Sequence, residues 1–79
     1  MAFLVYHVAL SFADGKHGPT ALEAFYCLSA TAAITRAELL SQKEGRIGAM
    51  AFSRTGDPVS GEFGDAVVLQ KFGVVGDII

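Results

Sequence analysis

The sequence predicts an α+β fold of order β-α-β-β, in which one long helix packs on one face of a three-stranded, mainly antiparallel sheet. Three observations support this fold: an apolar run near the N-terminus, a central stretch with helical spacing, and two apolar runs joined by a turn. Because folding units begin at about 50 residues, we expect the 79 residues to form a single domain, residues 1–79.

The first expected strand covers residues 2–12, which are rich in β-branched and aromatic side chains and end at an Ala-Asp-Gly turn signal. Alternate residues of this run are apolar on one face and mostly apolar on the other. Such a strand needs cover on both faces, and one helix supplies a single layer.

A helix is expected from Thr20 to about Lys43, ahead of Gly45. Residues 20–23, Thr-Ala-Leu-Glu, fit a capping box, in which the first and fourth side chains each accept a hydrogen bond from the backbone amide of the other residue. Small side chains fill the middle of this segment. The sequence leaves open whether the helix is continuous through residues 29–31 or is broken there into two helices.

Two further strands are expected over residues 46–56 and 62–73, joined by the turn at residues 57–61, Asp-Pro-Val-Ser-Gly. Pairing Asp57 with Glu62 would place Arg54 opposite Asp65, and a slip of one residue would lose this match of charge.

The hairpin alternates small and bulky apolar side chains. The small ones could lie under the helix, and the bulky ones would suit an interface with a second copy. The small set is Ala49, Ala51 and Ala66, and the bulky set is Met50, Phe52, Val67 and Leu69.

Composition predicts self-association. The chain is 52% hydrophobic and 18% charged, whereas charged residues make up about 25% of an average domain. A core this small supplies about 3 to 5 kcal/mol, and a single cysteine forms no disulfide within the chain. We therefore expect a homodimer, with a further protein partner as an open alternative.

A net charge of -2 with six scattered basic residues argues against nucleic acid as a partner.

The N-terminal apolar run is shorter than the roughly 20 residues of a membrane helix, and no basic residue precedes it. We expect neither an export signal nor a membrane partner. With one free cysteine, a reducing cytoplasm is the expected compartment.

Four polar residues are candidates for ligand binding. Lys16 and His17 lie in a glycine-bearing loop before the expected helix, where backbone amides and the helix dipole could hold an anion, although a plain solvated turn is the simpler interpretation. His7 could act as a general base or as a metal ligand, or could be a hydrogen-bonded histidine within the sheet or an interface. Arg54 is the fourth. No residues fit a catalytic motif or the spacing of a metal site, and no cofactor is expected.

The turn region carries a resemblance. Residues 52–58, Phe-Ser-Arg-Thr-Gly-Asp-Pro, followed by Gly-Glu-Phe at 61–63, look like a hairpin found in short bacterial proteins of uncharacterised function. The resemblance covers the C-terminal third of the chain. It implies a bacterial, cytoplasmic origin and assigns no activity or site residue.

Two hypotheses about function follow. The first is a small homodimeric binding or interaction module without catalysis. The alternative is a small ligand-binding protein or enzyme with a pocket between helix and sheet or between subunits, which should bring at least two of His7, Lys16, His17 and Arg54 within hydrogen-bond reach.

Overall fold

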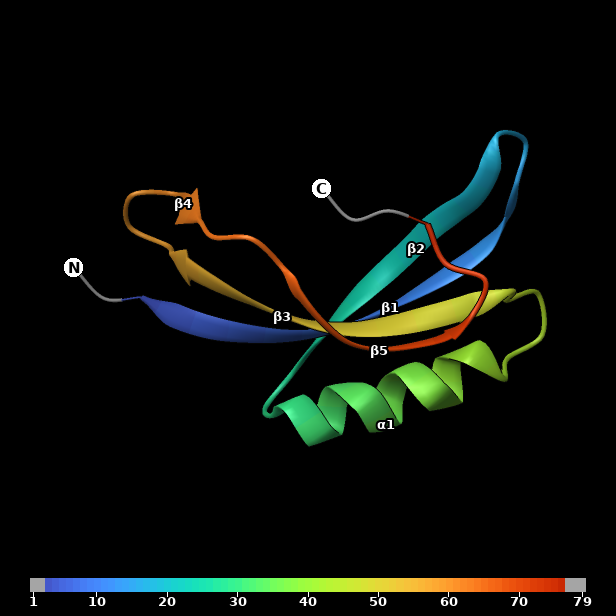
Figure 1. The fold of residues 1–79 in the computed structure, drawn as a ribbon, viewed down its shortest axis with the longest axis horizontal. Helices are drawn as coiled ribbons and strands as arrows, with labels where there is room; N and C mark the ends of the chain where they lie inside the picture. Colours follow the sequence, from blue (N-terminus) through green and yellow to red (C-terminus); the bar gives the residue numbers. More distant parts are fainter. Residues whose placement is uncertain (1–2, 77–79) are drawn as a thin grey trace.

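A computed structural model describes residues 3–76 as one five-stranded antiparallel sheet with a single helix on one of its faces (Figure 1). The elements are β1 (Leu4–Gly15), β2 (Gly18–Cys27), α1 (Ala30–Ser41), β3 (Gly48–Asp57), β4 (Glu62–Phe63) and β5 (Val67–Gly73). The strands are ordered β2-β1-β3, and both β4 and β5 pair with β3. The α+β class and the helix on one face are confirmed, but the prediction of three strands is wrong.

The extra long strand is β2, which occupies the segment expected to form the first half of the helix. It forms a hairpin with β1, in which Gly15 pairs with Gly18 across a two-residue turn, and Gly18 takes a φ of 114° that favours glycine. The Phe-Tyr-Cys run at 25–27 has high β-propensity, and pairing with β1 along the whole segment outweighs the local capping-box signal. The expected helix start at Thr20 is therefore wrong.

The helix begins at the break that the sequence left open. Ser29 is its N-cap, and the Ser29 hydroxyl accepts a hydrogen bond from the amide of Ala32 at 3.1 Å. The helix ends at Ser41, so it has 12 residues. Its buried positions, Ala33, Ala37 and Leu40, follow helical spacing and face the sheet.

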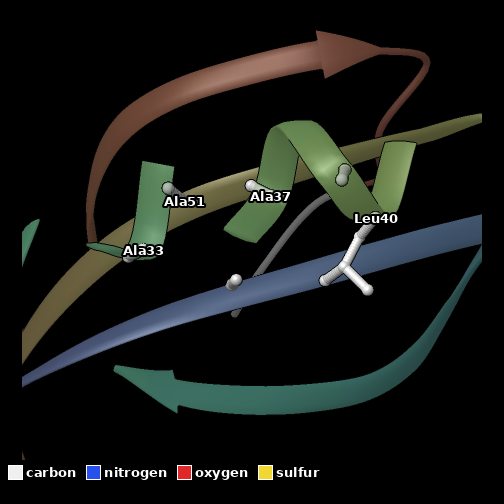
Figure 2. Close-up of a cluster of buried hydrophobic side chains, with 6 residues drawn as sticks. Ala33, Ala37, Leu40 and Ala51 are labelled. Atoms are coloured by element: carbon white, nitrogen blue, oxygen red, sulfur yellow. The ribbon is translucent and has the colours of Figure 1, made fainter. Parts of the chain in front are cut away.

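Small side chains fill the contact between helix and sheet. Ala33, Ala37 and Leu40 pack with Ala9 of β1 and with Ala49 and Ala51 of β3, as Figure 2 shows for this cluster. The placement of Ala49 and Ala51 under the helix is confirmed, whereas Ala66 lies between β4 and β5, outside this cluster. Because alanine has the smallest apolar side chain, the helix axis can approach the sheet closely.

The opposite face of the sheet, which we call the open face, is closed at only one end. There Phe12 and Met50 are almost fully buried, and Val75 packs against them. The amide of Val74 donates to the carbonyl of Ile47 at 3.0 Å and so holds this segment in place. Residues 77–79, at the C-terminal end of the chain, lie outside the described residues.

The register of the C-terminal hairpin differs from the predicted one. Asp57 does pair with Glu62, but residues 64–66 then leave the sheet, and β5 pairs with β3 around a bulge at Leu69. Arg54 therefore does not face Asp65, and its Nε donates to the carbonyl of Gly64 at 2.7 Å instead. The bulge lets Leu69 pack toward the helix-side core, whereas Met50 is buried on the open face. Neither residue is therefore part of a free patch.

Candidate functional site

A pocket of about 350 Å³ lies on the open face, away from the end that the C-terminal segment covers. It is lined by Tyr6 and Val8 of β1, Ala24 and Tyr26 of β2, Phe52 and Arg54 of β3, and Phe63 of β4. These residues share one face because side chains alternate along each strand and because the register pairs Val8 with both Tyr26 and Phe52.

Three aromatic rings form the walls of the pocket, with Tyr6 at the centre. The ring centroids of Tyr6 and Tyr26 are 5.9 Å apart at an interplanar angle of 70°. Those of Tyr6 and Phe63 are 6.1 Å apart at 45°. Edge-to-face and tilted pairs at these distances attract each other, so the walls are supported by their own contacts.

Arg54 is the charged residue of the pocket lining. Its Nε donates to the carbonyl of Gly64, and its guanidinium carbon lies 5.7 Å from the centroid of the Phe63 ring. These contacts fix the guanidinium group while its two Nη groups have no hydrogen-bond partner among residues 3–76. The described lining contains no histidine, cysteine or carboxylate. The arrangement is therefore suited to hold an apolar group next to a cation.

The loop residues Lys16 and His17 lie far from this pocket. They form the two-residue turn between β1 and β2, and both are exposed. No helix begins after this turn, so the helix dipole invoked for an anion site at these residues does not act there.

His7 lies on the helix side of the sheet. Its Nδ1 is 2.7 Å from the Oγ of Ser53, which is its cross-strand partner on β3, and the histidine is half-buried. Arg54 is next to Ser53 in the chain and so points to the other face. The structure thus separates His7, the pair Lys16 and His17, and Arg54 into three places, and only Arg54 lines the pocket.

Sequence reasoning missed the aromatic members of the pocket. Alternation along residues 2–12 places Tyr6 and Val8 on one face, and that signal was present. Tyr26 was assigned to a helix, and Phe63 enters the site only because β4 pairs beside Tyr6 and Arg54. The position of Tyr26 depends on the pairing of β1 with β2, and the contact of Phe63 with Tyr6 depends on the register between β1 and β3. The local sequence specifies neither of these pairings.

Two general features bear on other kinds of site. Within residues 3–76, no three histidine, cysteine or acidic side chains are grouped so that they could hold a metal ion. Over the same residues, no helix is long and apolar enough to cross a membrane.

No protein-family model, no curated protein and no solved structure matches this chain.

Proposed function

We propose that this chain is a homodimeric interaction module without catalytic activity, and that two copies meet through the apolar part of the sheet that the helix leaves uncovered. The observation that carries the proposal is the exposure of Val5 and Val67 on the helix side of the sheet, where the exposed fractions are 58% and 63%. Their cross-strand partners, Thr55 and Ser53, place both valines on this side. Phe3, which precedes β1, is also exposed.

The helix is too short to cover the whole face. A 12-residue helix is about 18 Å long, whereas a 12-residue strand such as β1 is about 40 Å long. Figure 1 shows the start of β1 and the end of β3 extending beyond α1. This extension carries the exposed side chains of Val5 and Val67 beside the polar residues His7, Ser53 and Thr55. Burial of the two valines favours a second copy as its cover.

The surface area of the chain supports the same conclusion. Its accessible surface is 5238 Å², whereas a compact monomer of 8.3 kDa exposes about 4,600 Å². Its radius of gyration of 12.8 Å likewise exceeds the value of about 11.6 Å for a compact chain of this length.

Pairing through strand edges is less favoured than pairing through this face. At the free edge of the sheet, β2 has a bulge at Leu22 and Glu23, which stand opposite Ser11. At the other edge, β5 has the bulge at Leu69. Bulges interrupt the regular row of backbone groups that a further strand would need.

Light scattering over a dilution series tests the proposal, with Val5→Glu as the variant and Leu39→Glu as its matched control. Leu39 has an exposed fraction of 57%, nearly that of Val5, but lies on α1. We expect the wild type and Leu39→Glu to have twice the 8.3 kDa chain mass and Val5→Glu to be a folded monomer. A wild type that is monomeric at every concentration, or equal dissociation of both variants, would contradict the proposal.

A bacterial origin and a reducing cytoplasm belong to the same proposal. They are supported by the hairpin resemblance at residues 52–63 and by Cys27, which is the one cysteine of the chain and is not in a disulfide.

A further inference from the structure

We propose that the pocket on the open face binds a small apolar carboxylate, with a planar ring among the aromatic side chains and its carboxylate held by Arg54. The pocket lies on the face opposite the surface proposed for dimerisation, so this inference goes beyond the proposed function. Four observations carry it: the volume, the composition of the lining, the position of the guanidinium group and the glycine beneath the wall.

The volume sets the size of the ligand. At about 350 Å³, the pocket is at the lower end of the range of about 300 to 1,000 Å³ that small-molecule sites occupy. It is open on one side, and the exposed ring of Tyr26 forms one wall. A single ring with a short side chain fits this space better than a larger cofactor does.

The charges of the lining set the sign of the ligand. Aromatic walls alone would also suit a quaternary ammonium group, which is commonly bound among several rings. Here Arg54 contributes a positive charge, and no carboxylate among the described lining residues offsets it. A cationic ligand would be repelled, and an anionic one would be attracted.

The guanidinium group is placed in advance for an anion. Because Nε donates to Gly64 and the group lies over Phe63, the side chain is already restrained, which reduces the conformational freedom lost when a ligand binds. The two Nη groups can donate in parallel to two oxygens, a geometry that suits a carboxylate. The apolar floor, Val8 and Phe52, lies beside this cation in the same pocket.

The wall formed by Phe63 depends on Gly56. A Cβ atom at Gly56 would be 2.3 Å from the Phe63 ring, so this ring uses space that only a glycine leaves free, and the same Cβ atom would be in tight contact with the Tyr6 ring at 3.1 Å. The pocket is therefore specified by the backbone as well as by its side chains.

Tyrosine emission provides a direct assay. The chain has two tyrosines and no tryptophan, and both tyrosines line the pocket. We would titrate phenylacetate into the full chain and follow tyrosine emission together with backbone amide spectra. Phenylacetamide tests the need for the negative charge, phenethylamine tests the sign, and acetate and inorganic phosphate test the need for the ring.

We expect phenylacetate to saturate the emission change and to shift the amide signals of Tyr6, Tyr26 and Arg54. Phenylacetamide should bind about tenfold more weakly or worse, because a hydrogen bond to a charged group is lost. Phenethylamine, acetate and phosphate should bind more weakly still. The inference is overturned if phenylacetate does not saturate, or if the amide, the amine or either ringless anion binds as tightly.

Arg54→Gln should weaken phenylacetate binding about tenfold or more. The matched control is Arg36→Gln, because Arg36 also lies over an aromatic ring, that of Phe25 at 5.3 Å, but on the helix side of the sheet. Equal weakening by both substitutions would overturn the inference. If Arg54→Gln does not fold, Tyr26→Ala replaces it, since Tyr26 is 74% exposed; unchanged binding in that variant would count against the site.

The titration is repeated with the Val5→Glu variant. Unchanged affinity in a folded monomer supports a pocket that is complete within one copy, whereas loss of binding there overturns the inference as stated. A failure of the dimer and a failure of the pocket are thus distinguished by separate measurements.

Discussion

Gly56 of β3 pairs with Phe63 of β4, and the Phe63 ring lies over the position that a side chain at Gly56 would occupy. A Cβ atom there would be 2.3 Å from the ring, closer than van der Waals contact permits. The glycine thus allows an exposed aromatic side chain to pack closely against a strand and beside Tyr6. The relationship links the backbone of the turn region to the shape of the pocket.

The first prediction is that Gly56→Ala displaces the Phe63 ring from Tyr6. Because Phe63 is on the short strand β4 and is exposed, its ring can swing toward solvent without disrupting the core. The ring signals of Tyr6 and Phe63 in proton spectra should shift, and contacts between the two rings should disappear. Gly64→Ala is the control, since a Cβ atom there meets nothing nearer than 3.6 Å. Retention of the ring contacts in Gly56→Ala would show that the wall does not depend on the glycine.

The second prediction concerns the close contact between helix and sheet. Ala37→Leu adds bulk where Ala37 is fully buried against the sheet, and it should destabilise the fold by about 1 to 3 kcal/mol. Ala32→Leu makes the same change on the exposed side of α1 and should alter the free energy of unfolding by less than about 0.5 kcal/mol. Urea denaturation measures both. Equal effects would mean that the helix does not lie as close to the sheet as the structure places it.

The third prediction separates the observed helix start from the one that the sequence favoured. Ser29→Ala removes the hydroxyl that caps Ala32, and it should lower the free energy of unfolding by about 1 kcal/mol. Thr20→Ala should lower the free energy of unfolding by much less, because Thr20 caps no helix. It lies in β2, where its hydroxyl makes only a long contact of 3.5 Å to the carbonyl of Gly18. Urea denaturation of the two variants gives the comparison. A larger loss in Thr20→Ala would favour the helix that begins at residue 20.

What the sequence could predict depended on how local each signal was. The first strand, the turn with Asp57 paired to Glu62, and the alanines under the helix all follow from alternation or turn chemistry within a few residues. The segment at 20–27 carries a local helix signal, a capping box, and is overruled by pairing with β1 along its whole length. The local pattern does not show that pairing with β1 competes with helix formation in this segment.

The candidate site was less predictable than the fold. Arg54 was singled out as a polar residue, but its partners Tyr6 and Phe63 come from two other strands. Their meeting depends on the β1 to β3 register and on residues 64–66 leaving the sheet. Asp65 was expected to pair with Arg54, and the local pattern did not indicate that the Arg54 Nε would instead donate to the carbonyl of Gly64.

The last prediction concerns the role of His7. The structure places its Nδ1 at 2.7 Å from the hydroxyl of Ser53 across the β1 to β3 pair, in a half-buried position. Ser53→Ala leaves the ring nitrogen without this partner and should cost about 1 kcal/mol or more. His7→Leu should likewise leave the hydroxyl without a partner. When both are replaced, neither polar group is left unsatisfied, so the double variant should be more stable than the sum of the two single losses implies.

A double-mutant cycle measured by urea denaturation checks this expectation. A coupling free energy of about 0.5 kcal/mol or more would show that the two side chains stabilise the sheet together. His7 would then act as a structural histidine of the strand pair, which accounts for a polar residue among the apolar side chains at the start of β1. Strict additivity would instead show that the contact between His7 and Ser53 does not contribute to the stability of the sheet.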